Sequence, residues 1–201
     1  MSTIADGRGL ADADIRPALR SRVLSAPDCE SDTAIIEELG VCRGQVRIDM
    51  TIVNGELHGY EIKSQRDTLR RLATQAEVYS RVLDHATLVI DGKHIAAALG
   101  IVPTWWGILR FECATGGPRF KMVRRGRKNL TRDPRSLAEL LWLEDAIALL
   151  DSHNAGRGVK GKPRRVVWDR VCETISLEEI ALVVRERLKA RAMLSTHAPR
   201  S

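Results

Sequence analysis

The sequence predicts an α/β protein in which helices flank one mixed β-sheet and a small helical unit follows at the C-terminus. Three observations indicate this fold class. An apolar content of 44% in 201 residues is enough for a sizeable core. Up to residue 90, helical patterns alternate with short β-branched stretches, as in a sheet with a helix-linked crossover. Beyond residue 134 the periodic segments are all helical.

The N-terminal part of the chain is expected to supply one helix and three strands. Residues 1–11 are small and polar, and we expect them to be disordered. A helix over 12–25 is predicted because Ile15, Leu19 and Val23 recur at helical spacing. Strands are expected at 33–41, 46–53 and 56–63. Asn54-Gly55, between the last two, is the strongest hairpin signal in the chain.

The remaining elements are predicted from capping residues, apolar stripes and turn signals. Ser64 and Asp67 have the spacing of a capping box, which predicts a helix over 65–83. Strands are expected at 85–90, 106–112 and 119–124, and helices at 93–99, 136–150, 164–174 and 177–192. The core therefore reads α-β-β-β-α-β. Its domain is expected over 12–125, and a helical C-terminal region over 134–195.

Composition restricts the classes of partner and compartment. The formal charge of +6 and a pI near 9.5 suit a polyanionic partner such as DNA. The four cysteines lack the spacing of zinc ligands. We expect a cytoplasmic protein without membrane contact, because no signal peptide or spanning segment is visible. A homodimer is compatible with the sequence.

Three charged residues on the predicted hairpin could carry chemistry. Asp49 lies in its first strand, and Glu61 and Lys63 lie in its second, where alternation puts both on one face. Two carboxylates on neighbouring strands can hold a hard divalent cation. The lysine could orient a nucleophilic water or offset developing charge.

The register of the hairpin decides whether Asp49 shares that face. A plain two-residue turn would put Asp49 opposite Tyr60 and send Glu61 to the other side. An odd register puts Ile48, Met50, Ile52, Tyr60 and Ile62 on one face, and Arg47, Asp49, Thr51, Glu61 and Lys63 on the other. Only this register separates apolar from charged faces, so we predict a bulged turn at Asn54-Gly55.

Three motifs resemble those of a known superfamily. Asp49, separated by eleven residues from Glu61-Ile-Lys63, resembles the core motif of the PD-(D/E)XK nuclease superfamily, and the element order is similar. Gln75-Ala-Glu-Val-Tyr79 resembles the Q-x-x-x-Y element of its RecB-like branch. The stretch from Gly59 to Asp84, with PTWWGI downstream, is similar to a widespread bacterial family assigned to that superfamily. Ile48 stands where the signature Pro would precede Asp49.

The resemblance implies a restriction-endonuclease-like core and a Mg²⁺- or Mn²⁺-dependent deoxyribonuclease acting in DNA repair, processing or defence. It implies that Asp49 and Glu61 are metal ligands, Lys63 the catalytic lysine and Gln75 a site-organising or DNA-contacting residue. An acidic residue upstream completes the metal shell in that branch, and Glu38 matches it by position. Glu37 is the alternative. The two side chains are expected to point to opposite faces, so at most one of them should reach the metal.

Other interpretations stay open. The three charged residues could be the solvated face of an antiparallel sheet. The chain could also be a DNA-binding module that keeps the nuclease fold without cleaving, or a partner-binding protein that uses its helical tail. Asp91-Gly-Lys93 fits the same triplet, but its place after a strand favours a turn. Tyr79 lies on the apolar stripe of its helix, which favours a core role.

Basic residues are candidates for nucleic-acid contact, although a merely solvated charge run is equally compatible with the sequence. The candidates are Arg47, Lys160, Lys162, Arg164 and Arg165. Lys160 and Lys162 lie between two predicted helices, and Arg164 and Arg165 lie at the start of the second. This arrangement is similar to small helix-extended-loop-helix DNA-binding modules such as SAP. Trp105 and Trp106 could stack on bases, but their apolar neighbours favour a core position.

Overall fold

The protein, described here from a computed structural model, is defined over residues 12–26, 32–114 and 117–197. The expected disorder of residues 1–11 lies outside the described residues. The elements are α1 Asp12–Leu24, β1 Ala34–Val41, β2 Val46–Asn54, β3 Glu56–Lys63, α2 Leu72–Ser80, β4 His85–Asp91, η1 Gly92–His94, α3 Ile95–Leu99, β5 Gly107–Ala114, β6 Gly117–Arg124, α4 Pro134–Ala138, α5 Leu143–Ser152, α6 Arg164–Thr174 and α7 Leu177–His197.

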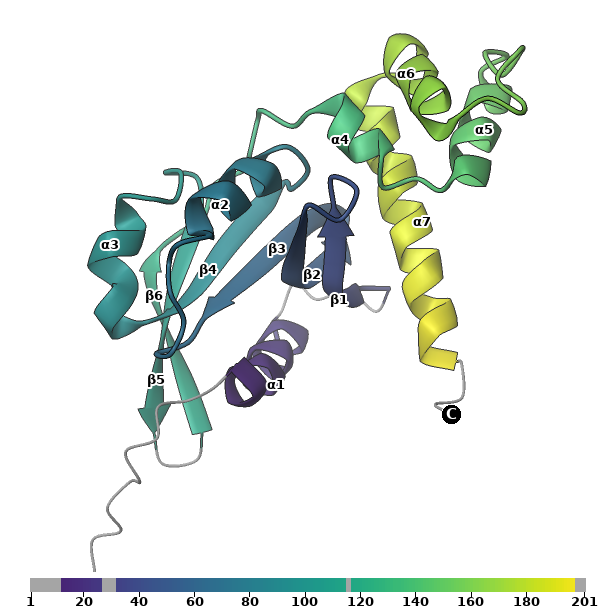
Figure 1. Ribbon diagram of the computed structural model, residues 1–201. Coiled ribbons are helices and arrows are strands. Elements are labelled where there is room, and N and C mark those ends of the chain that lie inside the picture. Colours follow the sequence, from purple (N-terminus) through teal and green to yellow (C-terminus); the bar gives the residue numbers. More distant parts are fainter. Residues whose placement is uncertain (1–11, 27–31, 115–116, 198–201) are drawn as a thin grey trace, which may run out of the picture.

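A six-stranded mixed sheet in the order β1-β2-β3-β4-β5-β6 forms the centre of the fold. Strands β3, β4 and β5 run parallel to one another, and the other neighbouring pairs are antiparallel. Helix α1 covers one face, α2 and α3 lie against the other, and α4 to α7 stand beyond β1 (Figure 1). The predicted mixed sheet flanked by helices is thus confirmed.

The hairpin of β2 and β3 has the odd register that the face pattern predicts. Asn54 pairs with Glu56, leaving Gly55 between them at φ +66°, a conformation that glycine adopts without strain. Met50 consequently pairs with Tyr60. The α1 side of the hairpin is apolar, and it carries Met50, Ile52 and Ile62, with Tyr60 packed against them.

One residue of the hairpin departs from the expected face. Ile48 packs with the core on the α2 side instead of joining Met50. The cause lies at the neighbouring position, where Glu38 of β1 has φ 54° and the Glu38–Asp49 pair is missing from an otherwise regular ladder. The alternation of side chains between the two faces of β2 is therefore interrupted at Asp49, so the direction of the Asp49 side chain is not set by the regular strand pattern.

Helix α2 begins seven residues later than predicted, at Leu72. The Ser64 amide and hydroxyl both donate to the Asp67 carboxylate, at 2.7 and 2.6 Å, so the expected capping contact is partly present. Residues 65–71 nevertheless form turns and irregular backbone, and apart from the half-buried Leu69 they are exposed. Helix nucleation costs free energy, and a first turn over these residues would bury no apolar face to offset it. The helix therefore begins at Leu72, which is buried.

The helix predicted over 136–150 is divided into α4 and α5. The carbonyls of Leu140 and Leu141 accept hydrogen bonds from the Arg191 guanidinium, at 3.0 Å, and the Trp168 indole, at 3.3 Å. Trp142 is extended, with ψ 162°, and is the N-cap residue of α5, which begins at Leu143. At the break, side chains from distant helices thus donate the hydrogen bonds that backbone amides would donate in a continuous helix.

Two apolar clusters hold the layers together. The smaller one joins Ile15 and Leu19 of α1 to the sheet. The larger one runs from the α2 side of the sheet into α4 to α7, so Ile48 and Val184 belong to one cluster. The helical region therefore packs on the sheet. None of the helices in the described part of the chain has both the length and the apolar character needed to cross a bilayer.

Candidate active site

The residues expected to carry chemistry meet in one cavity of about 500 Å³. Its walls come from α1, β1, the β1–β2 turn, β2, β3, the segment between β3 and α2, and α2. The residues predicted for the site that line it are Glu38, Arg47, Asp49, Glu61, Lys63 and Gln75. Lys160, Lys162, Arg164 and Arg165 do not belong to it; they are exposed in the helical C-terminal region.

Glu61 is the fixed centre of this cavity and is only 1% exposed. Its Oε1 accepts hydrogen bonds from Lys63 Nζ at 2.5 Å and Gln75 Nε2 at 2.6 Å, and its Oε2 accepts one from the Tyr79 hydroxyl at 2.5 Å. Lys63 shares its face because strand side chains alternate, and Gln75 and Tyr79 are one helical turn apart on α2. A buried carboxylate with three donors is held in a single orientation.

Tyr79 has a larger part in the site than its sequence pattern indicates. Its ring is fully buried and stacks on Trp106 at 5.7 Å, which confirms the expected core role. Its hydroxyl also donates to Glu61, and burial together with the charge of Glu61 raises the pKa of this phenol. The i, i+4 spacing of Gln75 and Tyr79 is the signal that could have indicated this second role.

Asp49 faces Glu61 across the parted strands. Its Oδ2 accepts a hydrogen bond from the backbone N–H of Ile62 at 2.6 Å. Burial, and after it the charge of Glu61, raises the pKa of the Asp49 carboxyl to about 7, although the Ile62 amide, Lys63 and Arg16 oppose the shift. Because the charge of Glu61 disfavours the ionised form of Asp49, a cation bound beside Asp49 would offset this repulsion.

Arg16 of α1 is a residue of this region that the sequence did not reveal. Its guanidinium lies 3.1 Å from Glu38 Oε1 and 3.7 Å from Asp49 Oδ1, and it donates to the Asp49 carbonyl at 2.6 Å. Its i, i+4 pairing with Asp12 could be expected from the sequence. The contacts with β1 and β2 could not, because they depend on how α1 docks on the sheet.

Asp49 and Glu61 offer two carboxylates on one cavity, the ligand type that a hydrated Mg²⁺ takes. Mg²⁺ commonly binds to one or two carboxylates, keeping its other positions for water and substrate phosphate. Gln75 Oε1 is buried and has no hydrogen-bond partner among the described residues, so an acceptor is available for an ordered water. Within the described ranges, however, no group of three or more His, Cys, Asp or Glu side chains is arranged to hold a metal. The role of Glu38 stays a prediction, since Arg16 lies beside its carboxylate.

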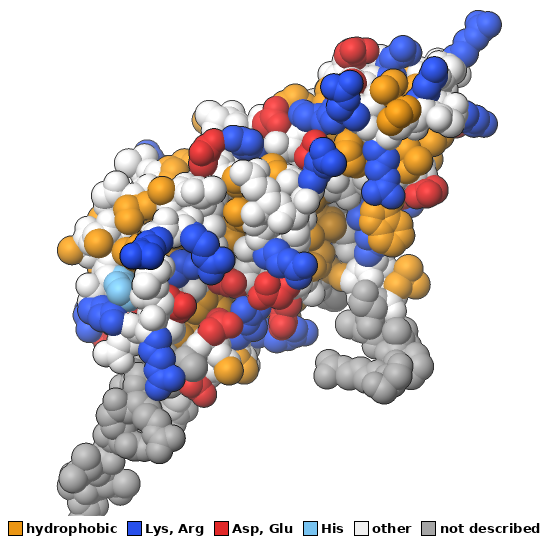
Figure 2. All heavy atoms as spheres, viewed as in Figure 1, with side chains coloured by type: hydrophobic (Ala, Val, Ile, Leu, Met, Phe, Trp, Pro, Cys, Tyr) orange, Lys and Arg blue, Asp and Glu red, His pale blue; other side chains and the backbone are white. Residues whose placement is uncertain are grey.

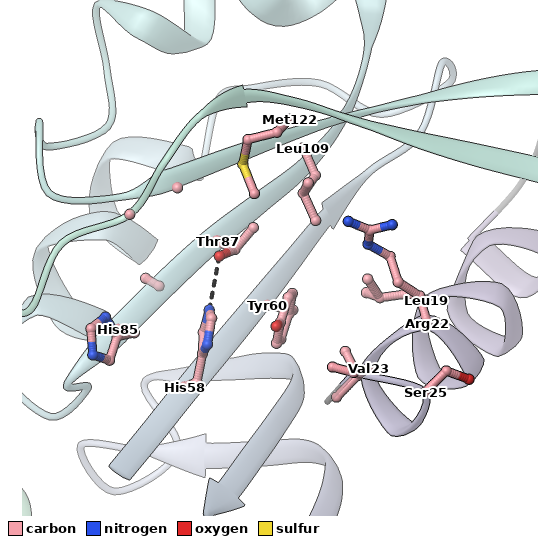
Figure 3. Close-up of a pocket in the computed structure, with 14 residues that line it drawn as sticks. Leu19, Arg22, Val23, Ser25, His58, Tyr60, His85, Thr87, Leu109 and Met122 are labelled. Atoms are coloured by element: carbon pink, nitrogen blue, oxygen red, sulfur yellow. Dashed lines mark hydrogen bonds between the residues drawn. The ribbon is translucent and has the colours of Figure 1, made fainter. Parts of the chain in front are cut away.

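A larger cavity, of about 700 Å³, lies on the α1 side of the sheet. Figure 3 shows the rings of His58 and Tyr60 side by side, with His58 hydrogen-bonded to Thr87 at 2.8 Å. Burial, followed by the charge of His85, lowers the pKa of His58 to about 3, so the imidazole is neutral. Among the residues that the structure describes, those that line this cavity include no carboxylate. We place the candidate chemistry on the α2 side, where Asp49 and Glu61 line one cavity.

The chain is similar in sequence to a phage protein family and more weakly similar in structure to a solved protein. The sequence profile of the family described as Bacteriophage P4 protein cII matches residues 12–197. Protein cII of Enterobacteria phage P4 is 33% identical over 97 residues, a match that covers 48% of this chain and only 37% of that relative. A solved protein of unknown function from Silicibacter pomeroyi has 18% identity and a TM-score of 0.40, over 94% of this chain and 92% of that chain.

Proposed function

The chain belongs to the bacteriophage P4 protein cII family, and from its own site we propose that it is a Mg²⁺-dependent deoxyribonuclease. Its core would be restriction-endonuclease-like, of the PD-(D/E)XK superfamily. The observation that carries the proposal is the buried Glu61 carboxylate, which Lys63, Gln75 and Tyr79 hold beside Asp49. Burying a charged pair costs several kcal/mol per ion in an order-of-magnitude estimate, and function is a common reason for such a cost.

The arrangement of the strands supports the same proposal. Residues 12–91 follow the order α-β-β-β-α-β, and the motif residues lie on β2, β3 and α2, as the superfamily resemblance implies. The break in pairing at Asp49 lets its carboxylate reach the Ile62 amide and approach Glu61. A merely solvated sheet face would leave these side chains exposed, whereas Glu61 and Lys63 are 1% and 6% exposed.

Each residue would have a distinct part in phosphodiester hydrolysis. Asp49 and Glu61 would hold the ion, which when bound polarises the phosphate and lowers the pKa of a water. Gln75 and Tyr79 keep Glu61 in place. Lys63 would orient the attacking water or offset the charge that develops on the phosphate. Arg16 balances the negative charge around Asp49 and Glu38.

A DNA-binding module that does not cleave is the second candidate. It is favoured by the lack of a three-residue metal cluster among the described side chains. In that case the buried Glu61 network would have a structural role, and the basic surface of the protein would bind DNA without a metal.

Cleavage of end-labelled single- and double-stranded DNA tests the proposal, with Mg²⁺, Mn²⁺ or EDTA. We expect metal-dependent cleavage that Asp49→Asn and Lys63→Ala each reduce by about a hundredfold or more, as loss of a transition-state contact does. Lys93→Ala is the matched control, because Asp91 and Lys93 have the same triplet spacing but form a turn cap. If no metal supports cleavage while wild type and variants bind DNA alike, the second candidate replaces the first.

A further inference from the structure

We propose that a groove on the helical C-terminal region binds single-stranded nucleic acid and directs it toward the cavity of Asp49 and Glu61. The groove has a volume of about 580 Å³. The basic and aromatic residues that line it are Arg43, Trp142, Arg164, Arg165 and Trp168, and Glu139 also belongs to its wall. The direction of the strand rests on the proposed nuclease function, but binding in the groove does not.

Trp142 is a preformed stacking surface at one side of the groove. It is 61% exposed, whereas Trp106 is 0% and Trp168 only 7% exposed. The Arg191 guanidinium lies 4.2 Å from the centre of the Trp142 ring, and it is itself held by Asp145 and the Leu140 carbonyl. The indole is therefore fixed while much of it remains accessible. A fixed aromatic ring loses little side-chain entropy when a base stacks on it.

The charges of the groove favour a polyanion. Arg43, Arg164 and Arg165 are exposed, and in the described part of the chain none of their guanidinium groups has a carboxylate partner. Glu139, the acidic residue of the groove, is paired with Arg135 at 3.2 Å. Figure 2 shows Lys and Arg side chains over this end of the molecule with exposed hydrophobic groups between them.

Basic and aromatic groups together select an unpaired strand over a duplex. Guanidinium groups can contact successive phosphates of either form. Stacking on an exposed indole requires a base whose face is free, which a paired and stacked duplex does not offer. The groove therefore fits single-stranded DNA or RNA, or the unpaired end of a duplex.

The β1–β2 turn connects the groove with the candidate active site. Arg43 lines the groove, and the next three residues, Gly44, Gln45 and Val46, line the cavity that holds Asp49 and Glu61. Adjacent Cα atoms are about 3.8 Å apart, so the two hollows lie on either side of one short turn. A strand that leaves Arg43 would have to cross only this turn to reach the carboxylates.

Binding of a fluorescein-labelled oligothymidylate of about 15 nucleotides tests the groove. It is measured by anisotropy in EDTA, with the full chain carrying Asp49→Asn so that no cleavage occurs. Trp142→Ala should weaken binding about tenfold or more, and Trp142→Phe should retain most of the affinity, since phenylalanine also stacks. Leu130→Ala is the control, because Leu130 is 86% exposed but lies outside the groove.

The salt dependence of binding tests the arginines. Arg164→Ala and Arg165→Ala should each reduce the slope of log K against log salt by about 0.7, the value for one phosphate contact of a single strand. Arg157→Ala removes the same charge from an exposed position outside the groove, and it should leave the slope nearly unchanged. Blunt duplex should bind more weakly than the single strand.

The outcomes separate this proposal from the nuclease. Trp142-dependent binding without cleavage by wild type would support the groove and count against the nuclease. Equal affinity of parent and Trp142→Ala would overturn the groove, even if wild type cleaves DNA. Absence of nucleic-acid binding, with a change of oligomeric state in Trp142→Ala by light scattering, would also overturn it and indicate a protein interface.

Discussion

The two faces of the sheet differ in the polar groups that they bury. On the α2 side, Glu61, Lys63 and Gln75 are buried in direct contact with one another. On the α1 side, the larger cavity contains a neutral His58 and mostly apolar neighbours. Cavity size is therefore a poor guide to chemistry in this protein. Ionised groups lose hydration when buried, so a cluster of them is the more informative sign.

Replacement of Glu61 should have the largest effect. Glu61→Gln keeps the size of the side chain but leaves Lys63 as a buried cation without its partner. We expect a loss of roughly 3–5 kcal/mol in unfolding free energy, the range for breaking a buried pair, and a loss of cleavage. Urea unfolding measures the free energy of unfolding, and the DNA cleavage assay measures the activity. A similar loss of cleavage in His58→Asn, on the opposite face, would remove the distinction between the faces.

The pH dependence of stability should differ in sign between the two faces. The pKa of His58 falls from 6.5 to about 3 on folding, so the unfolded chain binds more protons and stability decreases as pH falls below 6.5. The pKa of Asp49 rises from 3.8 to about 7, so the folded protein binds more protons and stability decreases as pH rises through that interval. Each contributes roughly 1 kcal/mol per pH unit.

Single substitutions separate these opposing contributions. Without metal, Asp49→Asn should make stability rise more steeply between pH 4 and 6.5 than in wild type, because only the His58 contribution remains. In His58→Asn the plot of stability against pH should be flat or fall with rising pH over the same interval, because the Asp49 contribution remains. Thermal or urea unfolding in EDTA at several pH values measures both variants. Parallel curves for wild type and both variants would contradict the assignments.

Hydrogen bonds on the two faces should contribute differently to the free energy of unfolding. Tyr79→Phe removes a donor from the buried Glu61 carboxylate while the ring can still stack on Trp106, and we expect a loss of about 2 kcal/mol. Thr87→Val removes the neutral bond to His58, with an expected loss of about 1 kcal/mol. Chemical denaturation of the two variants gives the difference. An equal loss would show that the Glu61 oxygen finds another donor.

The smallest effect is expected at α1, where two arginines provide a matched pair. Arg16→Gln removes a cation beside Asp49 and should raise the pKa of that carboxyl further, with a stability loss of about 1 kcal/mol. Arg20→Gln removes an exposed pair with Glu37, and its cost should be below about 0.5 kcal/mol. Carboxyl NMR titration measures the pKa. An unchanged Asp49 titration in Arg16→Gln would exclude the contact in solution.

Much of the site follows from patterns within short segments. The face pattern of the hairpin predicted its odd register, because burial separates apolar from charged side chains only in that register. Strand alternation placed Glu61 beside Lys63. These relations depend on local geometry, so the sequence alone determines them.

Tertiary packing decided the rest. The contacts of Arg16, the stacking of Arg191 on Trp142 and the break between α4 and α5 all join residues distant in the chain. The late start of α2 and the displaced side chain of Ile48 likewise depend on which surfaces neighbouring elements cover. The sequence alone determined the mixed α/β fold class, the hairpin register and the pairing of Glu61 with Lys63 on one strand face. Docking of the helices decided its electrostatic surroundings, because those contacts form only when long-range packing brings separate segments together.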